Sequence, residues 1–327
     1  MNQILGTHII GPKYHFYDED SVIEGAKRIY EMGSKIVKIR FESFDKLKQI
    51  SDIGFDEIFL WYDNPKPNEE IEDNYYYQNM YNLVKYILTT FKNTNKSFFI
   101  GHWEGDWLIN HYVPKENITK DAKEINIKRM INCLNVKRKA FDKAKEDFGL
   151  ENVNVYIYAE LNRVIDYIDK GLNRFVNKVL PYIDMDFISY SAYDLQNESK
   201  EKVHEVLDFI ESKMKQRSVE GFNKRVFIGE FGICAETVKY DEEKHKLVNL
   251  EIIGKFLSWG VPFIIYWEFY NNEVNEDLSH RGYWLIDNHN RKWPLYDFFK
   301  KYYQVLNENF ENNSQEILCN LISDEVL

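Results

Sequence analysis

The feature that most constrains the fold is an alternation, repeated eight times, of short apolar runs with longer amphipathic segments. The apolar runs are rich in β-branched and aromatic residues, as strands buried on both faces are. They are Ile4–Ile10, Lys35–Phe41, Glu57–Tyr62, Ser97–Glu104, Val153–Glu160, Asp186–Ser191, Arg225–Phe231 and Pro262–Trp267. The alternation predicts parallel strands closed into a single-domain (β/α)8 TIM barrel. Such barrels have about 250 residues plus insertions, which the 327 residues of this chain accommodate.

The amphipathic segments predict the helices that cover the barrel. They are Ser21–Glu31, Asn79–Phe91, Lys120–Phe148, Val203–Met214, Leu247–Leu257 and Pro294–Leu306, and Gly149 is a candidate C-cap for the third. A doubly wound open sheet is the alternative, but no Gly-x-Gly-x-x-Gly motif and no P-loop follows any predicted strand. We expect residues 1–306 to form the barrel and residues 307–327 to form a tail, either a short packed helix or a partly ordered end.

Composition excludes several classes of protein. The formal net charge of −11 argues against a nucleic-acid partner, because binding a phosphate backbone needs a basic surface. No apolar stretch reaches the ~18 residues of a membrane-spanning helix. Cys133, Cys234 and Cys319 lie far apart, so neither a disulfide nor a zinc site is expected, and no metal or other cofactor is predicted. The first residues lack a signal-peptide pattern, which predicts a cytoplasmic protein, although a secreted chain without its leader would look the same.

Two glutamates follow apolar strands and are candidates for acid–base chemistry. Glu230 ends the seventh strand between Gly229 and Gly232, and a carboxylate at the tip of a buried strand is costly to desolvate without a purpose. Glu104 ends the fourth strand, across the mouth of an eight-stranded barrel from the seventh. Hydrolysis of a glycosidic bond needs two carboxyl groups placed across a sugar ring. Arg40, at the end of the second strand, could hold one of them ionised.

These residues, in this order, resemble the (β/α)8 clan of retaining glycoside hydrolases that includes many cellulases, mannanases and β-glycosidases. The run Asp186–Tyr193 looks like the clan's motif on strand 6, and Gly229–Gly232 looks like its motif on strand 7. The resemblance implies the following roles: Glu104 as acid/base, Glu230 as nucleophile, Arg40 and Tyr193 as supports of the nucleophile, and Trp267 as the platform on which the sugar stacks.

Two positions depart from the clan's pattern, and one glutamate competes with Glu104. Trp103 stands where the clan has an asparagine that binds the sugar, and an indole cannot accept a hydrogen bond. Ser191 stands where the clan often has histidine. Glu160 lies in a run that looks like the clan's acid/base motif, but the strand count favours Glu104. The remaining residues predicted to contact substrate are His102, Trp103, Glu160, Asn162, Trp267 and Trp61.

The sequence therefore predicts a retaining glycoside hydrolase that acts on a β-linked glycoside or oligosaccharide, with a carbohydrate as its only expected partner. A catalytically inactive carbohydrate-binding barrel is the alternative, suggested by Trp103. A third hypothesis is a barrel enzyme of different chemistry that uses Glu230 as a general base.

Overall fold

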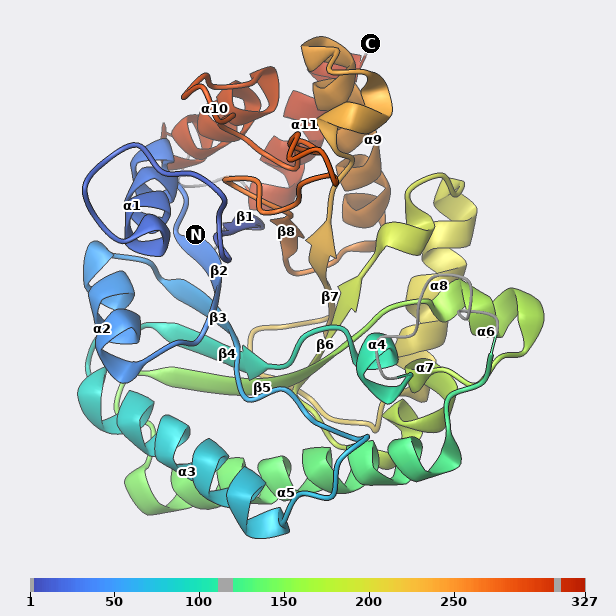
Figure 1. Cartoon of the computed structure of the whole chain (residues 1–327). Coiled ribbons are helices and arrows are strands. Elements are labelled where there is room, and N and C mark those ends of the chain that lie inside the picture. Colours follow the sequence, from blue (N-terminus) through green and yellow to red (C-terminus); the bar gives the residue numbers. More distant parts are fainter. Residues whose placement is uncertain (1–2, 111–119, 309–312, 327) are drawn as a thin grey trace. The chain divides into compact units, whose positions relative to one another are not determined.

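The structure is a computed structural model that describes residues 3–110, 120–308 and 313–326. Its strands run parallel and follow one another in chain order around a closed barrel, which confirms the predicted (β/α)8 fold. The strands, labelled in Figure 1, are β1 (Leu5–His8), β2 (Ile36–Arg40), β3 (Glu57–Trp61), β4 (Ser97–Gly101), β5 (Asn154–Leu161), β6 (Phe187–Ser191), β7 (Val226–Phe231) and β8 (Ile264–Tyr266). Each predicted strand overlaps one of these. The largest difference is at β4, which ends at Gly101 rather than at Glu104.

The helices include every predicted one and several short ones that the sequence pattern did not indicate. They are α1 (Ser21–Met32), α2 (Phe44–Ile53), α3 (Asp73–Thr90), α4 (Gly105–Ile109), α5 (Glu124–Phe148), α6 (Val164–Lys170), α7 (Phe175–Lys178), α8 (Lys200–Lys213), α9 (Glu242–Trp259), α10 (Pro294–Glu308) and α11 (Ser314–Val326). The short helices α2, α4, α6 and α7 were not predicted. In the predicted tail, residues 309–312 and 327 lie outside the described part, and α11 covers most of the remainder.

Local signals explain where the longer helices begin and end. The side chain of Asp20 accepts hydrogen bonds from the backbone N–H groups of Val22 and Ile23 in the first turn of α1, and Gly33 ends the helix with a φ of 114°. Asp241 caps α9 by accepting from the backbone N–H of Lys244, and Gly260 ends the helix in the left-handed conformation. Acceptors at the N-cap satisfy N–H groups that have no partner within the helix, and glycine adopts positive φ without strain.

Contacts divide the chain into two compact units, which are described separately below. Unit 1 comprises residues 1–58 and 228–327, and unit 2 comprises residues 59–227. Unit 1 therefore holds β1, β2, β8 and most of β7, whereas unit 2 holds β4, β5, β6 and most of β3.

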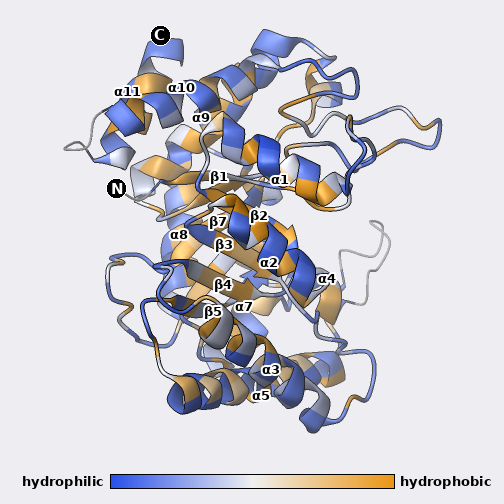
Figure 2. Cartoon of the chain, turned by 90° about the vertical axis from the view of Figure 1, so that its left-hand side faces the viewer, coloured by the Kyte–Doolittle hydropathy of each residue, from blue (hydrophilic) through white to orange (hydrophobic). Residues whose placement is uncertain are grey.

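Aromatic rings fill the interior of unit 2. Phe59 and Phe99 stack with their centroids 4.3 Å apart, and the ring of Phe227 lies 5.2 Å from that of Phe59. Outside the strands, α3 and α5 lie side by side (Figure 1). Figure 2 shows hydrophobic and hydrophilic residues mixed along both helices, as expected for helices that bury one face. The interior of unit 2 is thus a packed core, which leaves the ends of its strands to carry chemistry.

In unit 1, α11 packs beside α9 and α10. Gln315 on α11 donates from Nε2 to the carbonyl of Leu257 on α9 at 2.6 Å, and Glu325 forms an ion pair with Lys246 at 2.7 Å. The described helices include none that combines the length and the apolar character needed to span a bilayer.

Candidate active site

Glu230 lies on β7 at an irregularity of the sheet. The pairing of β7 with β8 shifts register between Ile228 and Phe231, so the irregular stretch contains Gly229 and Glu230. Bulges of this kind re-aim side chains and are common beside active sites. The Glu230 side chain is buried, with 5% exposure. Gly232 lets the backbone after Glu230 lie close to the backbone of Trp267, because a Cβ at position 232 would lie 2.6 Å from the carbonyl oxygen of Trp267.

Two buried basic side chains hold the carbonyl group that precedes Glu230. Lys38 on β2 donates from Nζ to the Gly229 oxygen at 2.9 Å, and Nε2 of His8 on β1 lies 2.8 Å from the same oxygen. Burial, reinforced by the Lys38 ammonium, lowers the pKa of His8 well below its usual value. The imidazole is therefore neutral, and its contact with a carbonyl oxygen puts the proton on Nε2.

Arg40, the predicted support of Glu230, is the exposed last residue of β2. It lies two residues after Lys38, so the two side chains share one face of the strand. Lys38 is fully buried, and it is the basic residue of β2 that contacts the backbone next to Glu230. The role of Arg40 stays a prediction, and Lys38 joins it as a candidate.

Trp267 is fixed from two sides at the end of β8. Its indole N–H donates to Oε1 of Glu273 at 3.1 Å, and its ring packs edge-on against His8 with centroids 4.9 Å apart. Arg281 in turn donates to Oε2 of Glu273 at 2.6 Å. Unit 1 thus brings together Glu230 and the predicted sugar platform, both anchored near His8.

Unit 2 brings together the two competing glutamates. Glu104 is the N-cap residue of α4 and is 5% exposed, whereas Glu160 lies within β5 and is fully buried. The backbone N–H of Glu104 donates to Oε1 of Glu160 at 3.2 Å. Each acid also has its own serine donor on β6: Ser189 donates to Oε2 of Glu160 at 2.7 Å, and Ser191 donates to Oε1 of Glu104.

This arrangement assigns different tasks to the two acids. Both carboxylate oxygens of Glu160 accept hydrogen bonds from the protein, and one of these bonds holds the backbone of Glu104. Glu160 therefore holds the backbone of Glu104 in place, and its predicted contact with substrate stays a prediction. The predicted role of Glu104 as acid/base likewise stays a prediction.

The remaining predicted residues of unit 2 lie at or just after the ends of its strands. His102 is buried and contacts the carbonyl of Trp103 through Nδ1 at 2.9 Å, while the Trp103 N–H donates to the side chain of Asn64 at 3.0 Å. Trp61 is the buried last residue of β3, and Tyr193 begins the short 3-10 turn after β6. Tyr193 and Glu230 belong to different units, so its predicted contact with the nucleophile stays a prediction.

Asn162 follows β5 and offers a buried acceptor. Its backbone N–H donates to Oδ2 of Asp106 at 3.1 Å, while its side-chain Oδ1 is buried with no hydrogen-bond donor among the described residues. A buried amide oxygen is normally paired, so an outside donor such as a ligand hydroxyl or a water would complete it. Asp106 also accepts from the N–H of Phe175 at 2.7 Å, and burial raises its pKa to about 7.

Sequence reasoning missed three buried titratable residues, Lys38, Asp106 and Glu268. Glu268 directly follows Trp267, and its Oε2 accepts from the N–H of Ile10 at 3.2 Å. Burial raises the pKa of Glu268 well above its usual value, with smaller contributions from the carboxylates of Glu273 and Glu230. Lys38 lies inside a predicted strand, and Asp106 and Glu268 lie just after predicted strands, but residue type alone did not reveal that these side chains are buried.

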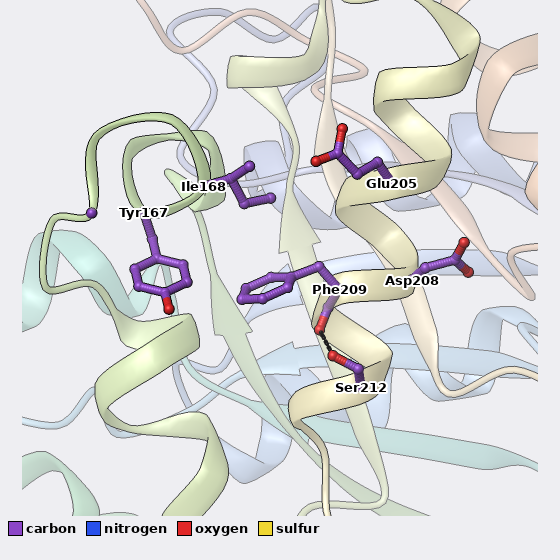
Figure 3. Close-up of a pocket in the computed structure, with 7 residues that line it drawn as sticks. Tyr167, Ile168, Glu205, Asp208, Phe209 and Ser212 are labelled. Carbon is purple, nitrogen blue, oxygen red and sulfur yellow. Dashed lines mark hydrogen bonds between the residues drawn. The ribbon is translucent and has the colours of Figure 1, made fainter.

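A pocket lies between α6 and α8, apart from the predicted residues (Figure 3). Figure 3 shows the rings of Tyr167 and Phe209 pointing toward each other, with centroids 5.4 Å apart. Glu205, which also lines it, is exposed and pairs with Lys202 at 3.3 Å. None of the predicted site residues lines this pocket. Among residues 3–110, 120–308 and 313–326, no group of three or more His, Cys, Asp or Glu side chains could hold a metal ion.

No family model matches this chain, and no curated protein matches it in sequence. Solved structures do match. One is a Bacteroidetes-affiliated GH5 cellulase linked with a polysaccharide utilization locus, at 14% identity over 98% of this chain and 94% of that chain, with a TM-score of 0.54. A GH5-4 broad specificity endoglucanase from Clostridium longisporum matches at 9% identity over 98% of this chain and 96% of that one, also with a TM-score of 0.54.

Longer enzymes match over part of their length. A GH2 β-galacturonidase from Eisenbergiella tayi matches at 15% identity over 93% of this chain, with a TM-score of 0.56. The chain spans 51% of that enzyme and 49% of a β-glucuronidase from Faecalibacterium prausnitzii. The chain therefore shares the barrel fold of GH2 and GH5 glycosidase structures, and the resemblance predicted from the sequence is confirmed for the fold.

Proposed function

We propose that this chain is a retaining glycoside hydrolase that acts on a β-linked glycoside or oligosaccharide. The observation that carries the proposal is the occurrence of two buried glutamates, one just after β4 and one at the end of β7 of a closed barrel. In barrels of this kind the carboxyl ends of all strands face one side, and active sites lie there. The structural likeness to glycosidases supports the same reading.

The reaction proceeds in two displacements. The carboxylate of Glu230 attacks the anomeric carbon, the bond to the leaving oxygen breaks, and Glu104 gives its proton to that oxygen. Glu104 then takes a proton from water as the water oxygen attacks the anomeric carbon and releases Glu230. The mechanism needs Glu104 neutral and Glu230 ionised at the start, so the two side chains must have different surroundings.

Their described surroundings do differ. The carbonyl before Glu230 lies against the buried Lys38 ammonium, and a nearby positive charge favours an ionised carboxylate. Glu104 has Ser191 as a neutral partner. Trp267, held by Glu273, supplies an aromatic face for the sugar, and Asn162 supplies a buried acceptor for one of its hydroxyl groups.

The test is the exchange of one carboxylate for an amide. Glu230→Gln should abolish hydrolysis of aryl β-glycosides while leaving the circular dichroism spectrum and melting temperature unchanged, because the side chains have the same shape. Glu220→Gln, on the exposed stretch before β7, is the matched control and should keep full activity. Full activity in the Glu230 variant would refute the assignment.

A carbohydrate-binding barrel without catalysis is the second candidate, and Trp103 is the observation that favours it. The indole replaces the amide expected beside the acid/base, and its backbone N–H is already bonded to Asn64. Calorimetry with neutral oligosaccharides, run beside the activity screen, separates the two functions. Tight binding without cleavage of any glycoside would favour the binding protein.

A further inference from the structure

Unit 1 contains a second pocket that the proposed chemistry does not use, called here the Tyr240 pocket. The loops that follow β7 and β8 form it, and its lining includes Tyr240, Leu278, His280, Trp284, Asp287 and Arg291. These loops extend from the strand ends that carry Glu230 and Trp267, which places the pocket on the catalytic face of the barrel.

Tyr240 presents a rigid aromatic surface to this pocket. Its side chain is 44% exposed, yet its hydroxyl donates to the carbonyl of His280 at 2.6 Å. The backbone of Tyr240 has a φ of 58° and its N–H donates to the carbonyl of Ala235 at 2.7 Å. An exposed ring that is fixed at both ends loses little conformational entropy when it binds a ligand.

His280 supplies a hydrogen-bond donor of defined tautomer. Its Nδ1 lies 3.0 Å from Nδ2 of Asn271, an amide nitrogen that can only donate, so Nδ1 is the acceptor. Partial burial, and then the neighbouring His289, lower the pKa of His280. At neutral pH the ring is therefore uncharged and carries its proton on Nε2, from which it can donate to a hydroxyl oxygen.

Trp284 has a buried indole N–H that lacks a hydrogen-bond acceptor among the described residues. Its side chain is 4% exposed, and its buried Nε1–H has no acceptor within the part of the chain that the structure describes. Leaving a buried donor unsatisfied costs about 1–3 kcal/mol, so such groups usually meet a ligand or an ordered water. The ring itself packs against Trp293 at 5.2 Å and lies 6.4 Å from Tyr240.

One cation of the pocket pairs with two carboxylates. Arg291 pairs with Glu242 at 3.0 Å and with Asp287 at 2.8 Å. Asp287 also accepts from the indole N–H of Trp293 at 3.2 Å, and these bonds lower its pKa despite the opposing effect of burial. The one guanidinium and two carboxylates leave a negative charge, which disfavours an anionic ligand, while the aromatic surface and the neutral donors suit a neutral polyhydroxylated ligand.

We propose that the Tyr240 pocket is a distal subsite that binds one neutral sugar residue of an oligosaccharide substrate. The inference rests on the proposed function and narrows the substrate from a simple glycoside to a chain of several sugars. A chain of hydrogen bonds connects the subsite to the sugar platform: Arg281, next to His280, donates to Glu273, which accepts from Trp267. The subsite and the sugar platform therefore share one set of hydrogen-bonded side chains.

The test uses binding and needs no turnover. In the Glu230→Gln protein, the indole N–H resonance of Trp284 is assigned by its loss in Trp284→Phe and is followed during titration with cellohexaose, mannohexaose and xylohexaose. At least one of these sugars should shift that resonance. Tyr240→Ala should weaken its binding about tenfold, the change expected when an aromatic anchor is lost. Tyr182→Ala removes a tyrosine of similar exposure (60%) from unit 2 and should leave the affinity unchanged.

Three results would overturn the subsite: no shift of the Trp284 resonance with any of the three sugars, a shift of other indole resonances only, or equal affinity in the Tyr240→Ala protein. The subsite and the hydrolase can fail separately. With Glu230 intact, the protein should hydrolyse short aryl glycosides equally well with and without Tyr240. If hexasaccharide binding also depends on Tyr240, both the hydrolase and the subsite are supported. Binding at Trp284 without any hydrolysis keeps the subsite and refutes the hydrolase.

Discussion

Replacing Ser191 by alanine removes a hydrogen-bond donor from Glu104, the proposed acid/base. The Ser191 hydroxyl donates to Oε1 of Glu104, and both side chains are buried. A hydrogen bond to an ionised carboxylate contributes about 1.5–3 kcal/mol, against roughly 0.5–1.5 kcal/mol for a neutral partner. The difference, about 1.4 kcal/mol, corresponds to about one pH unit. Because the bond favours the ionised form, its loss raises the pKa of Glu104.

The assay is the pH dependence of kcat/KM for an aryl glycoside, whose basic limb reports the pKa of the essential acid in the free enzyme. Ser191→Ala should move that limb about one pH unit higher, because Glu104 then keeps its proton at higher pH. Ser189→Ala is the matched control. It lies on the same strand, is equally buried and donates to Glu160 at 2.7 Å instead.

The pair of variants also decides between the two glutamates. With Glu104 as the acid, only the Ser191 variant moves the basic limb. With Glu160 as the acid, the Ser189 variant moves it and the Ser191 variant does not. A limb that stays in place in both variants, or moves to lower pH in the Ser191 variant, would refute the reasoning.

Two further predictions concern buried basic residues of unit 1. Lys38→Met removes the ammonium beside the Gly229 carbonyl, so the pKa of Glu230 should rise and the acid limb of kcat/KM should move up by about one pH unit. Lys48→Met, which changes an exposed lysine, is the control and should leave the limb in place. An unmoved limb in the Lys38 variant would contradict the prediction. Burial lowers the pKa of His245 to about 4, so its stabilising contribution is present above its usual value of 6.5 and is lost as pH falls toward 4. The free energy of unfolding, measured with urea, should fall between roughly pH 7.5 and pH 4.5 in the parent protein. In the His245→Phe protein this fall should be smaller by about 2.5 kcal/mol. Equal losses in the two proteins would show that His245 does not titrate in this way.

The barrel was predictable because its strands are buried on both faces. Runs such as Ile58–Trp61 and Val226–Ile228 have few competing interpretations once they alternate with helices. The helix α4 was not predictable from such patterns. It has only five residues, and its first, Gly105, fits because a Cβ there would meet the Phe175 ring at 2.4 Å and the Glu160 carbonyl oxygen at 2.8 Å. Those neighbours are distant in sequence.

The sequence predicts which residue types follow the strands, but not how deeply each of these side chains is buried. The alternation along β2 places Lys38 and Arg40 on one face, but the tilt and stagger of the strands decide which of them is buried. The register shift around Gly229 and Glu230 has no signal beyond the glycine. The serines that distinguish Glu104 from Glu160 are two residues apart on β6, and only the pairing of β5 with β6 reveals their separate partners.

In the proposed mechanism Glu230 forms a covalent bond to the sugar, and this intermediate can be trapped. A panel of β-glycosides with an activated leaving group and fluorine next to the anomeric carbon forms the glycosyl-enzyme faster than water removes it. The protein should gain the mass of one fluorosugar, and peptide mapping should find the sugar on Glu230. A fluorosugar attached to any other side chain, or hydrolysis with inverted anomeric configuration, would contradict the account.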